Sequence, residues 1–198
     1  MAPDDRRRAI VAAVVPLLLE HGDDVSTRQI ADAAGIAEGT IFRVFPDKAA
    51  LLMAAAEETM SPADARAELS AALDGLTSLR DKVVVTAQRL EERSARVMRV
   101  MMALRKQWMS DPASHARHGP QGPPAFFVEA DVALHEMLTE MFEPHRAELS
   151  VEPGRAALLL RTLVLGSCHP GSHHHERLTA DDVADALLDG IRNRRGRG

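Results

Sequence analysis

The stretch from Ser26 to Phe45 constrains the fold more than any other part of the sequence. Ser26, followed three residues later by Gln29, forms the capping-box pattern that marks the start of a helix. Gly35 can adopt the left-handed backbone conformation that ends a helix, and helix-forming residues resume at Glu38. The sequence therefore predicts two short helices around a glycine turn, the second from Glu38 to Phe45.

The spacing within these two helices suits a helix-turn-helix. In that motif two short helices cross closely, so a small residue is needed where they touch, glycine at the turn and apolar side chains on the inner faces. Ala31, Gly35 and Ile41 meet these three requirements. On spacing alone, an ordinary helical hairpin is the alternative interpretation.

The rest of the chain also favours helices. A length of 198 residues with 45% hydrophobic residues is enough for one or two domains with a real core. Only 3% of the residues are aromatic and none is Tyr, a composition that favours helix over sheet. Apolar periodicity and helix-end signals predict further helices at about residues 6–21, 48–60, 62–76, 78–108 with a break near Ser94, 124–143, 154–168 and 179–193.

Charge and cysteine content exclude few functions. The net charge is −5, and residues 1–50 hold six basic against eight acidic residues, so total charge does not indicate a nucleic-acid partner. Local convergence of positive groups decides that question instead. The single cysteine, Cys168, excludes an internal disulfide. Because no apolar run approaches the roughly 20 residues of a membrane span or resembles a signal peptide, we expect a cytoplasmic protein with no membrane partner.

The stretch STRQIADAAGIAEGTIFRVFPDKAALL, preceded by one amphipathic helix, resembles the DNA-binding domain of the TetR/AcrR transcriptional regulators. The resemblance covers about residues 6–52. The positions that match the family pattern are Thr27, Ile30, Ala31, Ala34, Gly35, Gly39, Thr40, Phe45, Lys48 and Leu51.

The resemblance implies an all-α fold in two domains. Residues 1–50 would form a three-helix DNA-binding domain with the helix-turn-helix, and residues 51–198 a helical domain for effector binding and dimerisation. The implied function is that of a ligand-responsive repressor, which binds a palindromic operator in double-stranded DNA as a homodimer joined through its last two helices. No enzymatic activity and no cofactor are expected, since no catalytic motif such as GxSxG, HExxH or a P-loop is present.

The resemblance also implies which residues contact DNA. Thr27 and Arg28 open the first helix of the motif, where free backbone N–H groups suit a phosphate oxygen. In the second helix, Gly39 leaves room for a close approach and Thr40 offers a hydroxyl to phosphate or base. Arg43 lies on the same face and can contact guanine with two hydrogen bonds, which makes it the best candidate for base recognition.

Two further predicted contacts, Phe42 and Lys48, complete this set. Lys48 begins the next helix as a point charge suited to phosphate. Phe42 stands where the family often has Tyr, so a phosphate-binding hydroxyl is missing. Ala37 stands where the family often has Ser or Thr, and the helix from Glu38 therefore lacks a side-chain cap worth about 1 kcal/mol. Arg6 to Arg8 could reach an adjacent DNA backbone, or they could form a solvated N-terminal face.

For the second domain, two sets of residues are candidates. A small-molecule effector of unknown identity could contact flexible methionines and flat aromatic rings, although core packing is the alternative for each: Met98, Met101, Met102, Trp108, Phe126, Phe127, Met137 and Met141. The apolar faces for a dimer bundle, which could instead complete the core of one protomer, are Leu159, Leu160, Leu163, Val164, Val183, Leu187 and Ile191.

The histidines from His169 to His175, next to Cys168, suggest a metal site by their chemistry. His173, His174 and His175 are adjacent, however, and cannot easily converge on one ion, so no metal site is assigned. A second hypothesis remains open: a helical protein that binds a small molecule or a metal and does not read DNA.

Overall fold

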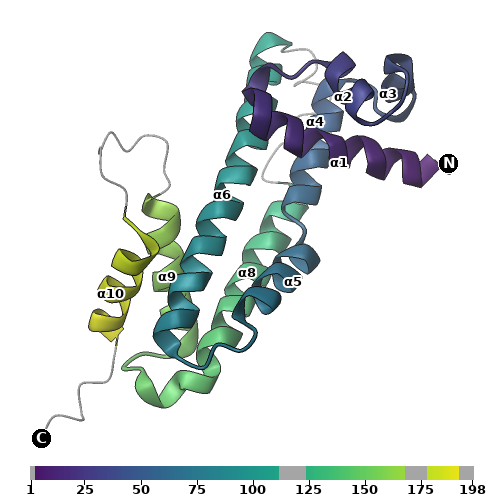
Figure 1. Cartoon of the computed structure of the whole chain (residues 1–198). Helices are drawn as coiled ribbons and strands as arrows, with labels where there is room; N and C mark the ends of the chain where they lie inside the picture. Colours follow the sequence, from purple (N-terminus) through teal and green to yellow (C-terminus); the bar gives the residue numbers. More distant parts are fainter. Residues whose placement is uncertain (1–2, 112–123, 168–177, 192–198) are drawn as a thin grey trace, which may run out of the picture. The chain divides into compact units, whose positions relative to one another are not determined.

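The computed structural model describes residues 3–111, 124–167 and 178–191, and these residues form helices joined by turns, with no strand among them (Figure 1). The prediction of an all-α fold is confirmed. Contacts divide the chain into two compact units: Met1–Ser61 with Arg96–Phe127, and Pro62–Ala95 with Val128–Gly198. The predicted division of the chain at residue 50, into a DNA-binding domain and an effector-binding and dimerisation domain, is a division by function and stays a prediction.

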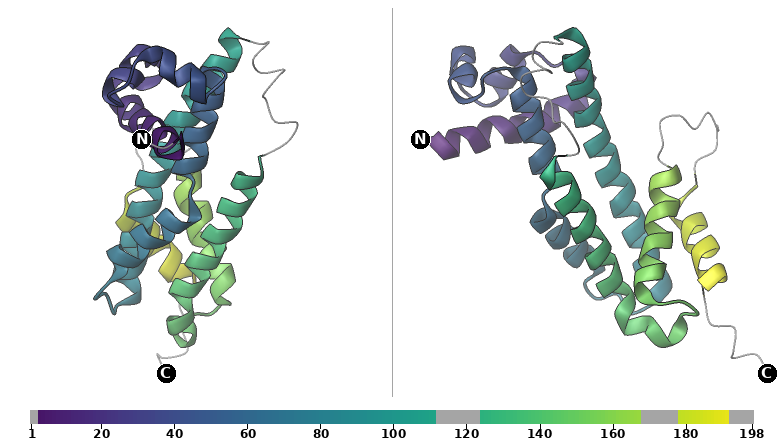
Figure 2. Two further views of the ribbon diagram at one scale, coloured as in Figure 1. Left: turned by 90° about the vertical axis from the view of Figure 1, so that its right-hand side faces the viewer. Right: turned by 180° about the vertical axis from the view of Figure 1, so that it is seen from behind.

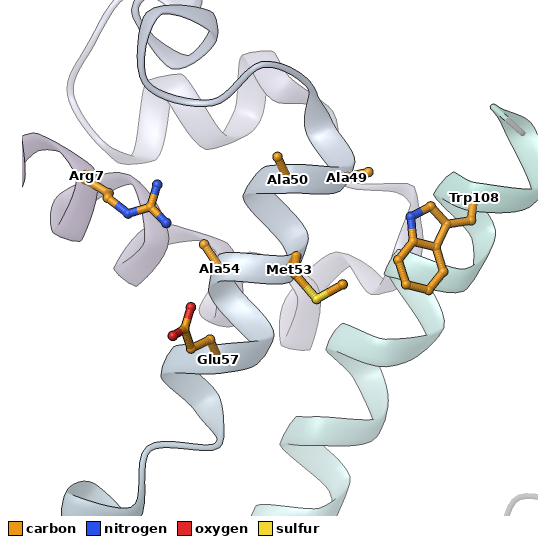
Figure 3. Close-up of a pocket in the computed structure, with 7 residues that line it drawn as sticks. All are labelled: Arg7, Ala49, Ala50, Met53, Ala54, Glu57 and Trp108. Carbon is orange, nitrogen blue, oxygen red and sulfur yellow. The ribbon is translucent and has the colours of Figure 1, made fainter. Parts of the chain in front are cut away.

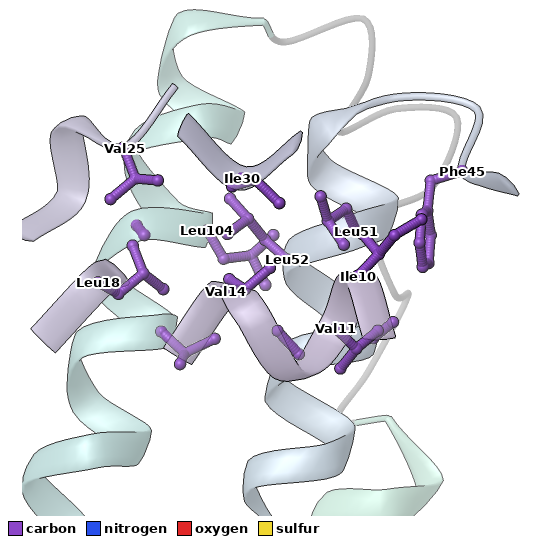
Figure 4. Close-up of a cluster of buried hydrophobic side chains, with 14 of the residues drawn as sticks. Ile10, Val11, Val14, Leu18, Val25, Ile30, Phe45, Leu51, Leu52 and Leu104 are labelled. Atoms are coloured by element: carbon purple, nitrogen blue, oxygen red, sulfur yellow. The ribbon is translucent and has the colours of Figure 1, made fainter. Parts of the chain in front are cut away.

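The first unit contains the predicted helix-turn-helix. Its elements are α1 (Pro3–His21), the 3-10 helix η1 (Gly22–Asp24), α2 (Thr27–Ala33), α3 (Glu38–Val44), α4 (Lys48–Thr59) and the second half of α6 (Leu79–Ser110). Helix α1 packs against α2, α3 and α4. Their shared core is drawn in Figure 4 and includes Ile10, Val14, Leu18, Val25, Ile30, Phe45, Leu51, Leu52 and Leu104.

The second unit contains α5 (Pro62–Leu73), the first half of α6, α8 (Ala125–Phe142) except its first turn, the 3-10 helix η2 (Glu143–Glu148), α9 (Pro153–Ser167) and α10 (Ala180–Ile191). Helices α9 and α10 lie side by side (Figure 2). Ser150, which lies three residues before α9, holds the end of α10, because its backbone N–H and its hydroxyl both donate to the Ile191 carbonyl, at 2.6 and 2.8 Å.

Helix α10 starts with a capping box. The Asp182 backbone N–H donates to the Thr179 hydroxyl oxygen at 3.1 Å, and the Asp182 carboxylate accepts from the Thr179 hydroxyl and N–H. The bond from the Thr179 hydroxyl, and to a smaller extent the bond from its N–H, stabilise the ionised carboxylate and so lower the pKa of Asp182.

The predicted break near Ser94 is wrong, because α6 runs without interruption from Leu79 to Ser110. Serine in a helix costs less than about 0.7 kcal/mol relative to alanine. That cost is small beside the burial of Leu90 and Val100, which lie on either side of Ser94 and belong to the cores of the two units. The other predicted helices lie within a few residues of their observed bounds.

Ile41 and Phe42 provide a direct test of which face of α3 is buried. Ile41 is 0% exposed and Phe42 is 50% exposed. We expect Ile41→Ala to lower the free energy of unfolding of the first unit by about 2–5 kcal/mol, since it leaves a cavity in the core. Phe42→Ala should change it by less than about 0.5 kcal/mol.

The measurement is urea unfolding followed by the fluorescence of Trp108. Trp108 is the only tryptophan of the chain and packs against the core of the first unit. Equal losses in the two variants would contradict the observed orientation of α3.

Candidate nucleic-acid interface

The first helix of the motif, α2, starts with a complete capping box, as predicted. The Gln29 backbone N–H donates to the Ser26 hydroxyl oxygen at 3.2 Å, and the Gln29 side-chain oxygen accepts from the Ser26 backbone N–H at 2.8 Å. Val25 and Ile30, on either side of this cap, are both buried. The chain therefore enters α2 in a fixed direction.

The turn between α2 and α3 closes around Gly35, whose φ is +67°. The Gly35 N–H donates to the Asp32 carbonyl at 3.2 Å and the Ile36 N–H to the Ala31 carbonyl at 3.0 Å. This pair of bonds is the Schellman motif, which requires the left-handed conformation at its glycine position. The predicted role of Gly35 is confirmed.

Packing across the turn brings α2 and α3 together. Ala31 and Ile41 are both buried in the core of the first unit, together with Ile30 and Phe45. Since the inner face of α3 is occupied in this way, its opposite face is directed to solvent. The motif is therefore a helix-turn-helix, packed as the spacing predicts.

The solvent-facing side of α3 carries most of the predicted base-reading residues. Gly39, Phe42 and Arg43 are exposed, and Thr40 is half-buried. A Cβ atom added at Gly39 would meet no atom within 4 Å, so packing within the protomer does not require a glycine there. As predicted, Ala37 provides no side-chain cap.

One residue on this surface was not predicted. Glu38 is exposed in the first turn of α3, and its carboxylate accepts a hydrogen bond of 2.5 Å from the Thr27 hydroxyl at the start of α2. Thr27 is half-buried and Arg28 is exposed. The signal that could have found Glu38 is its position at the start of the exposed face of α3, beside Gly39.

Lys48 has a structural contact in addition to its predicted role. Its ammonium donates to the Val25 carbonyl at 2.5 Å, in a partly buried position. The Asp47 side chain caps the same end of α4 by accepting from the Ala50 N–H at 2.8 Å. Lys48 thus connects the start of α4 to the residue before the capping box of α2.

Arg7 and Arg8 have partners within the first unit. The guanidinium carbon of Arg7 lies 4.6 Å from the centroid of the Phe45 ring, within the range of a cation–π contact. Arg8 pairs with Asp5 at 2.7 Å. Neither alternative from the sequence, a reach towards DNA or a purely solvated face, included the contact of Arg7 with Phe45.

Helix α6 is attached to the same unit by polar contacts. Lys106 forms an ion pair with Asp24 of η1, and its hydrogen bond and charge lower the pKa of Asp24. The Arg99 guanidinium donates to the Leu19 carbonyl at 3.4 Å. These contacts fix the C-terminal half of α6 against the end of α1.

The predicted effector residues are divided between the two units. Met101, Trp108 and Phe126 pack on the core of the first unit, where Phe126 also stacks on Phe127 with ring centroids 4.7 Å apart. Met98 and Met102 are exposed. By contrast, the two remaining candidates belong to the second unit, where Met141 is buried in the core and Met137 is 5% exposed.

Two of the hollows among the described residues lie in the first unit. One, of about 200 Å³, has Arg7 of α1 and Trp108 of α6 on opposite sides of α4 (Figure 3), and its other lining residues are Ala49, Ala50, Met53, Ala54 and Glu57. The second, of about 450 Å³, is lined by Met102, Arg105, Lys106, Met109 and Ser110. Each hollow includes only one predicted effector residue, Trp108 or Met102.

Five of the residues predicted for a dimer bundle are already buried in the core of the second unit: Leu160, Val164, Val183, Leu187 and Ile191. For these residues, the alternative that they complete the core of one protomer is the observed arrangement. Other apolar side chains of α9 remain at the surface, Leu158 with 40% and Leu165 with 38% of its area exposed.

Metal and membrane sites receive no support within the described ranges. There, no group of three or more His, Cys, Asp or Glu side chains could hold a metal ion. Cys168 and the histidines from His169 to His175 lie outside the described residues. None of the helices searched is both long and apolar enough to cross a membrane.

Comparisons with known proteins agree with this geometry. Residues 10–55 match the family model described as bacterial regulatory proteins, tetR family. No curated protein matches the sequence. The fold resembles that of the TetR transcriptional regulator SCO0520 from Streptomyces coelicolor, with a TM-score of 0.60 and 23% identity over 95% of this chain and 99% of that chain.

Two other solved structures show a similar fold. A putative TetR-family transcriptional regulator from Mesorhizobium loti MAFF303099 has a TM-score of 0.60 and 20% identity, covering 96% of each chain. The superantigen PfiT has a TM-score of 0.59 and 20% identity, covering 98% of this chain and 100% of that one. The fold is thus also present in a protein described by another activity.

Fold and site together define an all-α protein with an N-terminal helix-turn-helix. The match at residues 10–55 confirms the resemblance of the N-terminal part to the tetR family, and the chain as a whole shares its fold with the solved structures above.

Two glycines of the motif provide a matched test of the turn. Gly35→Ala should lower the free energy of unfolding of the first unit by about 1–2 kcal/mol, because alanine is strained at positive φ. Gly39→Ala should leave it unchanged or raise it by up to about 1 kcal/mol, since position 39 is helical with open space around it. Urea unfolding followed by Trp108 fluorescence measures both; an unaffected Gly35→Ala variant would contradict the turn.

Proposed function

We propose that the chain is a ligand-responsive repressor that binds a palindromic operator as a homodimer and has no enzymatic activity. In this proposal residues 1–50 bind DNA in the cytoplasm, and residues 51–198 bind the effector and form the dimer. The single observation that supports it best is the exposed face of α3, with Gly39, Phe42 and Arg43 directed to solvent and Ile41 buried behind them.

Each proposed DNA contact has a distinct chemical role. Arg43 donates two hydrogen bonds to guanine in the major groove, and Phe42 packs against a thymine methyl group. Gly39 permits close approach, and Thr40 donates its hydroxyl to a phosphate or a base. These residues determine which sequence is bound.

Phosphate contacts come from the neighbouring helices. Arg28 is exposed at the start of α2, where the free backbone N–H groups of Thr27 and Arg28 can donate to a phosphate oxygen. Lys48 can contact a phosphate while keeping its bond to the Val25 carbonyl, because an ammonium group can donate three hydrogen bonds. Such contacts set the register of the protein on the duplex without reading its sequence.

The two copies of α3 in a dimer would enter successive major grooves. Recognition helices of dimeric helix-turn-helix proteins lie about 34–36 Å apart, one turn of DNA. A small molecule would release the DNA if it binds more tightly to a conformation with another separation, because only a difference in affinity shifts such an equilibrium. Candidate effector contacts remain Met98, Met101, Met102, Trp108, Phe126, Phe127, Met137 and Met141.

Gel retardation with DNA that flanks the gene encoding this protein tests the DNA-binding part of this proposal. Arg43→Ala and Thr40→Ala should each weaken specific binding by roughly 5- to 100-fold, the cost of losing one base or backbone contact of this kind. Binding of the unchanged protein should fall steeply between 50 and 200 mM salt, since phosphate contacts release counterions.

Arg89→Ala is the matched control, because Arg89 is exposed, pairs with Glu92 and lies in the second unit. Its DNA affinity should equal that of the unchanged protein. If Arg43→Ala and Thr40→Ala also bind normally, α3 does not read DNA. A complete absence of retardation would favour the alternative, a helical protein that binds a small molecule or a metal.

The proposed dimer uses the outer face of α9, together with α10. Leu158 and Leu165 are seven residues apart, two helical turns, and lie on one face of α9. Both remain exposed in the protomer, whereas the inner residues of α9 are used by its core. Packing these leucines against a second copy would remove them from water.

The double variant Leu158→Glu, Leu165→Glu should therefore be monomeric in sedimentation velocity at concentrations where the unchanged protein is a dimer, since burying two carboxylates opposes association. Leu19→Glu is the matched control: Leu19 is 41% exposed and lies in the first unit. The control should stay dimeric. A dimeric double variant would exclude this face of α9 as the interface.

A further inference from the structure

We infer that Glu38 reads a cytosine in each operator half-site by accepting a hydrogen bond from the exocyclic amine of that base. This inference rests on the proposed function, because it requires α3 to enter the major groove. It assigns a specificity-determining role to a residue that sequence comparison with the family pattern did not single out.

The position of Glu38 places it with the base-reading residues. Residues four apart lie on the same face of a helix. Glu38 therefore neighbours Phe42 on the surface of α3, and Gly39 neighbours Arg43 in the same way. All four are exposed. In helix-turn-helix proteins the N-terminal residues of the recognition helix contact the edges of the bases, and Glu38 is the first residue of α3.

The bond from Thr27 orients the carboxylate before DNA is present. The Thr27 hydroxyl occupies one oxygen of Glu38 at 2.5 Å. An ionised carboxylate has two oxygens with about four acceptor sites, so the group can accept a second bond from a base. Because the side chain is already held, less rotamer freedom is lost when DNA binds.

The charge of Glu38 limits which base it can face. Guanine presents two acceptors in the major groove and thymine presents one acceptor and a methyl group, and acceptors repel a carboxylate. Adenine places an acceptor, N7, beside its donor amine. Cytosine offers its amine as a donor and no acceptor of its own. A carboxylate on this face therefore discriminates in favour of cytosine.

The spacing along α3 relates this cytosine to the guanine proposed for Arg43. Glu38 and Arg43 are five residues apart, which corresponds to roughly 7.5 Å along a helix axis. Successive base pairs are about 3.4 Å apart. For a helix lying along the groove, the two bases are therefore about two base-pair steps apart.

Selection of bound sequences from a random DNA library tests the inference, using the full-length protein and three variants. The unchanged protein should enrich a cytosine about two steps from the position that loses its guanine preference in Arg43→Ala. Glu38→Gln keeps an oxygen that can accept from Thr27, but its amide suits adenine. Its preference for cytosine over adenine at that one position should fall by about tenfold or reverse.

Thr27→Val separates recognition of the base by Glu38 from the support that Thr27 gives to Glu38. The variant removes the hydrogen bond between the two side chains and keeps the Glu38 carboxylate. It should bind more weakly to all sequences and still prefer cytosine. Trp108 fluorescence during urea unfolding shows whether each variant is folded.

Three results have distinct meanings. If the unchanged protein enriches no sequence, the proposed function fails. If it enriches a site and Glu38→Gln enriches the same site at every position, the inference about Glu38 is overturned while the proposed function stands. Loss of all base preferences in both Glu38→Gln and Thr27→Val, with a lowered unfolding midpoint, would likewise overturn it, because Glu38 would then only brace the motif.

Discussion

The close contact of α2 with α3 across the Gly35 turn is the interaction on which the rest of the site depends. Ala31 is small enough to let the two helices approach, and Ile41 fills the space between them and the core. The left-handed glycine turns the chain within two residues. Since α3 has only seven residues, it cannot be stable as an isolated helix, and its direction is fixed by this packing.

Fixing the inner face of α3 decides what its outer face can do. The residues left in solvent are a carboxylate, a glycine, an aromatic ring and a guanidinium: Glu38, Gly39, Phe42 and Arg43. These groups differ in charge, size and hydrogen bonding, so they can distinguish the edges of different bases. A chain with a net charge of −5 can therefore be suited to DNA through one small surface, while its total charge indicates the opposite.

Local features of the site could be predicted from the sequence, and contacts between distant residues could not. The capping box of Ser26 and Gln29 and the turn at Gly35 are set by neighbours a few residues apart. The bond between Thr27 and Glu38 joins residues 11 apart, and that between Lys48 and Val25 joins residues 23 apart. Periodicity carries no information about such pairs.

The helices that follow the helix-turn-helix show the same limit of prediction from sequence. Apolar periodicity located α9 and α10, yet it could not tell whether Leu160 and Leu187 face the core of their own protomer or a second copy. The break predicted near Ser94 failed because a single residue of modest helix propensity does not outweigh burial on both sides of it. The sequence likewise could not predict which methionines and aromatic rings pack together, because tertiary packing divides them between the two units.

The central claim is that α3 enters the major groove, and methylation interference on DNA that flanks the gene tests it most directly. A methyl group on guanine N7 lies in the major groove, where Arg43 would bind. The account predicts two groups of interfering guanines, centred about 10 base pairs or a multiple of that apart, which disappear in Arg43→Ala. Interference confined to adenine N3 in the minor groove, or the same guanines in Arg43→Ala, would contradict it.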